Sequence, residues 1–228
     1  MPKTLVAVTR PQLSPTPRST IKRGKKRAVT GRAALDAILD AGIICHLSVV
    51  VDGSPLVLPT GYGRDGETLY LHGSTGALSL RSALANEICV AVTLLDGIVY
   101  ARSVFHFSAN YRSAVIHGPA RLVESTEERL HGLRVLTEHM APGSWEHCRQ
   151  PNPKELAKTT VLALSLDEAA VKVRSGGPGD EPEDVFEDSA WAGVLPLTQQ
   201  WGSPVPSDDL SAGWEIPAHV RDRSASHG

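Results

Sequence analysis

The 228-residue sequence predicts a mainly β protein with flanking helices, in which six to seven antiparallel strands close into a barrel. Two observations predict this class. Three Asp-Gly dipeptides, at 52–53, 65–66 and 96–97, each stand between alternating apolar runs, which is typical of antiparallel hairpins. A meander of this length also has exposed edges, and closure into a barrel removes them.

The first segment, residues 1–29, is predicted to be a mobile basic arm outside the barrel. It is rich in proline and carries the basic run Lys22–Arg27, and neither feature favours packing. We interpret it as a solvated tail, with contact to nucleic acid or to an acidic partner as the alternative. The barrel domain then occupies residues 30–175.

Within this domain, apolar alternation predicts strands at 43–51, 55–62, 67–72, 88–95, 98–107 and 111–124, and a seventh at 160–166 that 169–173 continues. Helical spacing predicts helices at 30–42, 76–86 and 125–140, with a short turn or helix at 153–158. Thr30 is the expected N-cap of the first helix, and Ser125 or Thr126 that of the third.

The remaining chain is predicted to form two further parts. Residues 176–198 comprise an acidic, glycine-rich loop over 176–189 and an apolar stretch, 191–197, that docks back on the barrel. Residues 199–228 form a polar tail without a pattern.

Composition excludes several classes. The formal net charge of -2 argues against a surface built for nucleic acid, and no apolar run is long enough to span a membrane. Three unpaired cysteines without a Cys-x-x-Cys motif favour buried thiols in a reducing compartment. Nine histidines show no ligand spacing, so no metal site is expected. The expected location is cytoplasmic.

The stretch Leu69–Leu84 carries the first candidate site. A strand ends in the turn Gly73-Ser74-Thr75-Gly76 and a helix follows, so free backbone N–H groups and the helix dipole favour a bound anion. The alternative is an ordinary helix start capped by Ser74 or Thr75.

The second candidate site is Ala101–Ser113, which concentrates Arg102, Tyr111 and Arg112 between two strands. Arginine is a bidentate partner for phosphate, so this cluster favours an anionic or planar ligand, and a solvated hairpin is the alternative. Lys172 and Arg174 end the last strand on one side of the pleat, where exposed strand-end charges are the alternative. Because no nucleophile motif is present, any chemistry is expected to belong to a bound cofactor.

Three segments carry a family resemblance: ILDAGIICHLSVVVDGSPLVLPTGYGRDGETLYLHGS, TLLDGIVYARSVFHFSANYRSAVIHG and KVRSGGPGDEPEDV followed by WAGVLPL. They resemble the flavin-binding split-barrel superfamily, in the branch related to pyridoxamine 5′-phosphate oxidase and to the nitroimidazole-resistance proteins. The resemblance covers residues 30–198. It implies a Greek-key split barrel and a homodimer with flavin mononucleotide (FMN) at the subunit interface, while deazaflavin and haem are alternative cofactors.

The resemblance also implies roles for residues. His72 resembles a reactive-site histidine of the nitroimidazole-resistance proteins and is the candidate catalytic residue. Together with the cation clusters, the candidate cofactor-binding residues are Val57, Leu58, Pro59, Thr60, Tyr62, Leu71, His72, Gly73, Ser74, Thr75, Gly76, Ala77, Arg102, Tyr111, Arg112, Ser113 and Lys172.

One departure bears on the activity. The oxidase has an arginine–lysine pair where this chain has Gly76-Ala77, and it uses a C-terminal Trp and Arg for pyridoxal phosphate, whereas the tail of this chain is unrelated. The function expected is therefore an FMN-dependent oxidoreductase acting on a small planar or nitroaromatic substrate. Pyridoxamine 5′-phosphate oxidation is one alternative, and a non-catalytic protein that binds or stores flavin or haem is the other.

Overall fold

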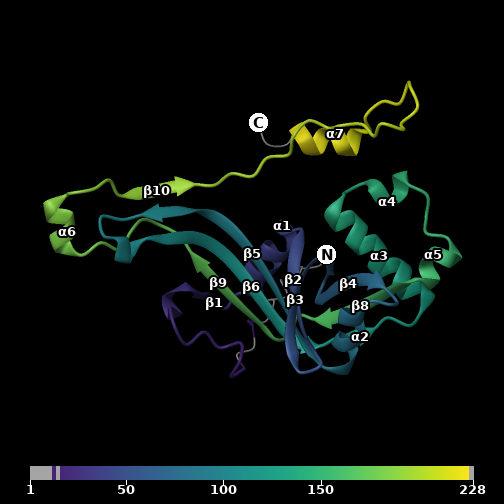
Figure 1. Ribbon diagram of the computed structural model, residues 1–228, viewed down its shortest axis with the longest axis horizontal. Helices are drawn as coiled ribbons and strands as arrows, with labels where there is room; N and C mark the ends of the chain where they lie inside the picture. The colour runs from purple at the N-terminus through teal and green to yellow at the C-terminus, as the bar shows by residue number, and fades with distance from the viewer. Residues whose placement is uncertain (1–11, 14–15, 226–228) are drawn as a thin grey trace, which may run out of the picture.

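The computed structural model describes residues 12, 13 and 16–225, and it is an antiparallel split barrel with helices on its outside (Figure 1). The predicted fold class is confirmed. Ten strands form one sheet in the order β1-β9-β6-β5-β2-β3-β4-β8-β7, and β10 is added to β5. The strands are β1 (Ala28–Val29), β2 (Ile44–Val51), β3 (Ser54–Asp65), β4 (Thr68–Ser74), β5 (Glu87–Tyr100), β6 (Ser108–Pro119), β7 (Arg121–Leu122), β8 (Thr159–Ser165), β9 (Ala169–Arg174) and β10 (Gly193–Pro196).

Six of the described α-helices occupy connections between strands, and α7 follows the last strand, β10. They are α1 (Arg32–Ala41), α2 (Leu78–Ala85), α3 (Thr126–Met140), α4 (Ser144–His147), α5 (Pro153–Ala157), α6 (Pro182–Glu187) and α7 (Ala218–Ala225). Two 3₁₀ turns, η1 (Lys25–Arg27) and η2 (Val104–His106), complete the described elements. Ser125 caps α3 as expected, because its hydroxyl accepts a hydrogen bond from Glu128 N. Thr30 does not cap α1, whose N-cap is Gly31.

The core lies inside the barrel and is built from the inward faces of β2, β4, β5, β6, β8 and β9 together with α1. A second, smaller cluster lies between α3 and the outer face of β4 and β8. Here α3 sits directly on the strands, since a Cβ on Gly63 would lie 2.7 Å from Val135 O. Gly63 therefore lets a helix backbone touch a strand backbone, which brings α3 close enough to wall a site beside β4.

The Asp96-Gly97 turn was wrongly predicted. β5 runs on through this dipeptide, and its register to β6 shifts between Leu95 and Gly97. Asp96 is the extra residue of a bulge, and bulges bend a strand without reversing it. Gly97 serves a close approach instead, because a Cβ there would lie 2.7 Å from Leu195 O of β10.

Three other segments differ from expectation. β8 and β9 are separate strands, because the turn after Ser165 moves the chain from pairing with β4 to pairing with β6. The acidic loop contains α6, which has Pro182 and two acidic residues in its first turn. The tail contains α7, which lies next to α3 and α4.

The described part of the N-terminal segment also differs from the expected mobile arm. Leu13 is buried in the core, and Leu13 N donates to Thr30 O at 2.9 Å. Arg18 forms ion pairs with Glu87 and Glu168, and β1 pairs with β9. Residues 1–11, 14 and 15 of the arm lie outside the described residues. The segment from Thr16 onward is therefore part of the packed structure.

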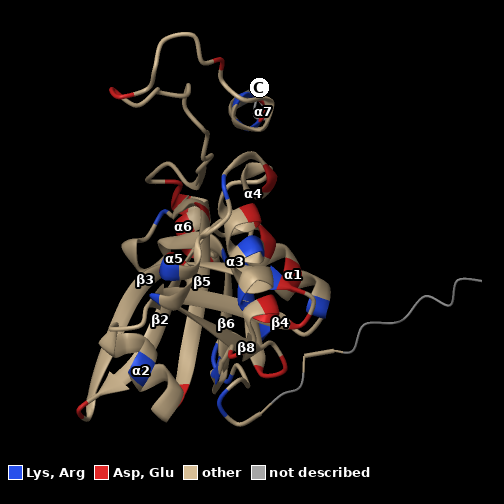
Figure 2. Ribbon diagram, turned by 90° about the vertical axis from the view of Figure 1, so that its right-hand side faces the viewer, with Lys and Arg blue, Asp and Glu red and all other residues tan. Residues whose placement is uncertain are grey.

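Long strands β5 and β6 extend from the barrel as an arm, with β10 along one edge and α6 at the tip (Figure 1). After β10 the chain crosses above the barrel to α7 (Figure 1). Charged residues gather on the helices and turns, whereas the long strands are almost free of them (Figure 2). Over the described residues, every helix is too short or too polar to cross a bilayer.

Tyr62 provides a test of the packing. Its hydroxyl is buried and lies 2.6 Å from Leu39 O and 2.9 Å from Gly42 O, both at the end of α1. Tyr62→Phe should lower the free energy of unfolding by about 1–3 kcal/mol, because two buried carbonyls lose their shared donor. Urea denaturation measures this. Tyr100→Phe is the control, since the Tyr100 hydroxyl has no hydrogen bond to a described residue, and an equal loss in both variants would contradict the assignment.

Candidate functional site

His72 lies near the end of β4, where successive side chains face opposite sides of the strand. Leu69 and Leu71 face the barrel core, whereas Tyr70 packs in the cluster beneath α3. His72 is two residues from Tyr70 and shares its face. Its ring therefore lies on the α3 side of the sheet, outside the barrel.

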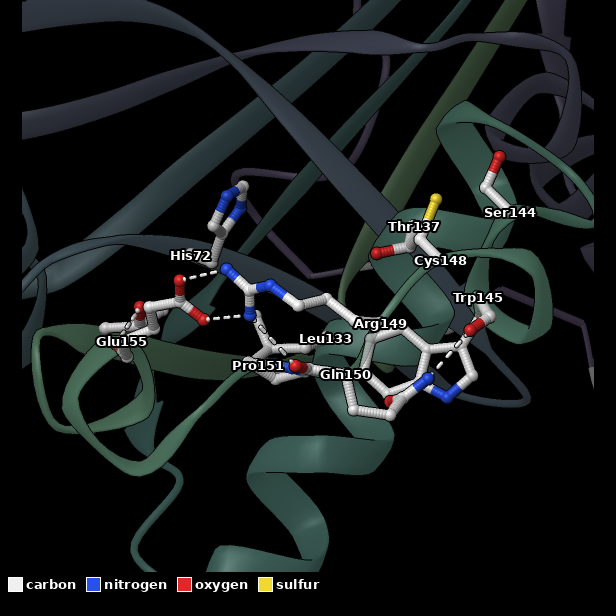
Figure 3. A pocket seen from close by; sticks show the side chains of 11 residues that line it. His72, Leu133, Thr137, Ser144, Trp145, Cys148, Arg149, Gln150, Pro151 and Glu155 are labelled. Atoms are coloured by element: carbon white, nitrogen blue, oxygen red, sulfur yellow. Dashed lines mark hydrogen bonds and ion pairs between the residues drawn. The ribbon is translucent and has the colours of Figure 1, made fainter. Parts of the chain in front are cut away.

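A pocket of about 440 Å³ opens beside this ring (Figure 3). Leu133 and Thr137 of α3 form one wall. The segment around α4 and α5 and the start of β8 form the rest, through Ser144, Trp145, Cys148, Arg149, Gln150, Pro151, Glu155 and Thr159. His72 and the Cys148 thiol stand on opposite sides of the space (Figure 3).

The pocket rim is held by two contacts within its own segment. Arg149 Nη2 donates to Glu155 Oε1 at 2.6 Å, and Gln150 Nε2 donates to Trp145 O at 2.7 Å. The hydrogen bond from Arg149, with a second from the Asn152 backbone N–H, lowers the pKa of Glu155 to about 2. The Arg149–Glu155 pair therefore stays ionised at neutral pH and fixes the loop that carries Trp145 and Cys148.

His72, together with Thr159, lines this space from the sheet. Burial lowers the pKa of its imidazole, so the ring is neutral at physiological pH. Its Nδ1 is buried and has no hydrogen-bond partner among the described residues. Buried polar atoms are almost always paired, so an unpaired ring nitrogen at this depth is uncommon. A neutral imidazole has a lone pair available for a metal.

The turn after β4 was the first candidate anion site. α2 begins at Leu78, and its N-cap is Ala77, which makes no side-chain capping bond. The alternative, a helix start capped by Ser74 or Thr75, is not what the structure has: the Ser74 hydroxyl accepts from Gly76 N, and Thr75 N donates to Lys158 O. The first-turn N–H groups of α2 therefore lack a side-chain acceptor, and the exposed turn leaves them open to an anion. Gly73 lets α2 pack here, since a Cβ would lie 2.8 Å from Leu80 Cδ1.

The candidate residues on β3 and β4 divide into two groups. Val57 and Pro59 are exposed on the outer face of the sheet, and Leu58 and Thr60 are half-buried. Tyr62 and Leu71 are core residues with 1% exposure each, so their side chains are not available to a ligand.

The two arginines of the second candidate site already have ion-pair partners. Arg102 donates to Asp180 and Asp188, and Arg112 donates to Asp96. Both arginines thus have carboxylate partners within the chain. Tyr111 and Ser113 are half-buried on β6, and Ser113 lies opposite Lys172 of β9 on the outer face. The structure brings Ser113 and Lys172 together, and it separates both from the turn at Ser74 within one chain.

The sequence-based reasoning missed most of the His72 pocket. Trp145 lies in α4, and Cys148 and Arg149 lie between α4 and α5, in a stretch that appeared to be a connection. One signal was available: SWEHCRQPNP places aromatic, thiol and charged side chains in ten residues directly after the Pro142-Gly143 helix stop. Such a density of reactive groups in a loop is typical of a site.

The split barrel places the chain in a class of β+α barrel proteins to which flavin-binding proteins belong. The chain belongs to the pyridoxamine 5′-phosphate oxidase family, whose model matches residues 31–173. A comparison with curated proteins found no match.

Several solved structures are similar to this chain. The flavocytochrome Anf3 from Azotobacter vinelandii is 34% identical over 91% of this chain and 97% of its own, with a TM-score of 0.87. The FAD and haem binding protein from Mycobacterium smegmatis is 38% identical over 87% and 97%, with a TM-score of 0.83. A putative 5-nitroimidazole antibiotic resistance protein from Bacteroides thetaiotaomicron is 21% identical over 64% and 86%, with a TM-score of 0.56, which supports the fold alone.

Proposed function

We propose that this protein is a redox protein that binds one flavin and one haem. The observation that carries this proposal is the similarity along nearly the whole chain to two proteins described as a flavocytochrome and as an FAD and haem binding protein, at 34% and 38% identity. A flavin exchanges hydride or single electrons, and a haem exchanges single electrons, so the pair connects two-electron to one-electron chemistry.

The His72 pocket is the proposed haem site. A histidine that binds haem iron must be neutral, and the porphyrin ring favours apolar surroundings. His72 meets the first condition, because burial lowers the pKa of its imidazole. Leu133, Trp145 and Pro151 supply apolar surface around it. In this assignment His72 would hold the iron, and the walls from α3 and the α4–α5 segment would flank the porphyrin ring.

The flavin is proposed to bind with its phosphate at the turn 74–77, where the first-turn N–H groups of α2 are open. FMN was the cofactor expected from the sequence, and the M. smegmatis relative is described as binding FAD, so both flavins are candidates. His72 lies two residues before this turn, so one strand end carries the proposed ligand of the haem and leads into the proposed flavin loop.

A second copy of the chain is proposed to complete the flavin site. The outer face of the central sheet carries the cross-strand row His46, Ala91, Val115 and Ala170, with large apolar residues beside it such as Ile44 and Val50, 49% and 46% exposed. A solvent-facing sheet normally alternates to polar residues, and an apolar face of this kind marks an interface. A homodimer would cover this face and bring Ser113 and Lys172 of one chain to the turn at Ser74 of its partner.

The alternatives are less well supported. Gly76-Ala77 lack the cations expected for pyridoxamine 5′-phosphate oxidation, and the nitroaromatic substrate rests on a similarity of fold alone. A non-catalytic flavin and haem carrier would have the same site.

Cofactor analysis of the purified protein tests the proposal. After expression with haem supply, we expect both a flavin spectrum and a Soret band, close to one flavin and one haem per chain, in a species that sediments as a dimer. Addition of a chemical reductant should bleach the flavin and shift the Soret band. A protein that takes up neither cofactor would overturn the proposal. Cofactors that are bound but never reduced by a nicotinamide donor would favour the carrier.

A further inference from the structure

The described end of the N-terminal segment places a run of cations on the barrel, here named the basic segment (Arg23–Arg27). Arg27 N donates to Gly24 O at 2.9 Å, which closes the η1 turn. The next residue, Ala28, pairs with Lys172 of β9. The basic segment is therefore fixed next to a lysine that lies on the outer face of the sheet.

A cavity of about 580 Å³ lies between the basic segment and Lys172. Its lining consists of one glycine and five cations, namely Arg23, Gly24, Lys25, Lys26, Arg27 and Lys172. Among the described residues, none of the five cations has an ion-pair partner. Two of them converge on Gly24: a Cβ built there would lie 3.6 Å from Lys172 Nζ and 3.8 Å from Arg27 Cδ.

This arrangement contrasts with the other cations that the sequence marked as phosphate partners. Arg102 and Arg112 are held by carboxylates, and Arg174 donates to Asn110 Oδ1 and to the carbonyl of Gly177. The chain has 25 acidic and 23 basic residues, so acidic partners are not scarce. Five like charges around one cavity repel one another, and an anion with several charges removes that repulsion.

We propose that the basic segment and Lys172 bind the diphosphate group of a nucleotide or dinucleotide. Lysine and arginine are the side chains that bind phosphate, and charge-assisted hydrogen bonds to it are about twice as strong as neutral ones. The cavity volume lies within the range of about 300–1,000 Å³ for small-molecule sites. Gly24, with φ +67, gives the turn that lets both cation stems approach.

Two sources have this chemistry. The first is the diphosphate of a bound FAD. This source rests on the proposed function, in which Ser113 and Lys172, paired across β6 and β9 on the outer face of the sheet, border the flavin. The second is the diphosphate of a separate nicotinamide dinucleotide that donates electrons, and this source does not depend on flavin at the proposed site.

Calorimetric titration of the full-length protein as purified tests the proposal. ADP, inorganic pyrophosphate and adenosine are the probes, and the flavin released on heating is identified as FAD or FMN. In the double variant Lys25→Glu/Lys26→Glu we expect either binding of ADP and pyrophosphate weakened about tenfold or more, or a loss of FAD with FMN retained. The first result identifies a separate nucleotide, and the second identifies the flavin's own diphosphate. Adenosine should not bind in either case.

The control is Arg134→Glu/Lys154→Glu, which makes the same change in net charge on α3 and α5, away from the basic segment. It should retain wild-type affinity for ADP and wild-type flavin content. Equal effects in the two double variants would overturn the proposal, as would binding of heparin or RNA by the wild type without binding of ADP, pyrophosphate or FAD. A protein free of flavin that still binds ADP through Lys25 and Lys26 would retain this site while the proposed function fails.

Discussion

Replacing His72 by alanine should abolish haem binding and leave flavin binding within about threefold of the wild-type affinity. The neutral imidazole of His72 lines the 440 Å³ pocket, so its loss would leave the proposed haem without a ligand from β4. The flavin contacts proposed at residues 74–77 come from backbone N–H groups, which alanine at position 72 does not change. Haem titration followed by the Soret band, with flavin fluorescence measured in parallel, gives both quantities.

His131→Ala is the matched control. His131 lies on α3 at the protein surface, where its ring contacts Asp65, and it does not line the pocket. It should retain full haem uptake. The assignment is wrong if H72A keeps a wild-type Soret band, and a loss of both cofactors together with a lower melting temperature would point to misfolding instead. Addition of free imidazole separates these cases, because it should restore the Soret band of a folded H72A protein.

Deleting residues 1–29 should destabilise the protein by about 2–4 kcal/mol, since it removes a buried leucine and a strand from the sheet. Leu13 is 6% exposed and packs in the main core, and β1 covers the edge of β9. Urea denaturation of the full-length and shortened chains measures the difference. An unchanged midpoint would show that the segment contributes nothing to folding.

The point variant Leu13→Ala separates the two contributions. It removes the buried side chain and keeps β1, so it should account for about 2–3 kcal/mol of the loss. Arg18→Ala should have a much smaller effect, because the Arg18 side chain is 41% exposed at its ion pairs with Glu87 and Glu168.

The sequence predicted those elements whose cause is local. Alternation located β2, β3, β4 and β6 to within a few residues, and the Ser125 cap located the start of α3. The prediction of a turn at Asp96-Gly97 was wrong because turns and bulges use the same residue types. Pairing with β6 and β10 decides between the two. The prediction of a mobile N-terminal segment was wrong for a similar reason. Proline and like charge favour mobility, but the burial of Leu13 and the β1–β9 pairing depend on long-range contacts.

The candidate site was predicted in part. His72 and the turn at Ser74 lie together because they are neighbours in the sequence. The ion pairs of Arg102 could not be predicted, since its partners Asp180 and Asp188 are 78 and 86 residues away in the chain. The pocket beside His72 needed the position of α3, which depends on the contact of Gly63 with the helix backbone.

The chain between β10 and α7 is a long loop fastened at both ends. Holding its far end costs conformational entropy, and few contacts offset that cost. Arg223 lies 4.1 Å from the centre of the Trp201 ring and donates to Met140 O, and the rings of His219 and His147 are 5.0 Å apart. Local opening should therefore begin at α7, before the barrel. Because α7 lies against the start of α4, which carries Ser144 and Trp145 of the His72 pocket, local opening of α7 should loosen that wall of the pocket.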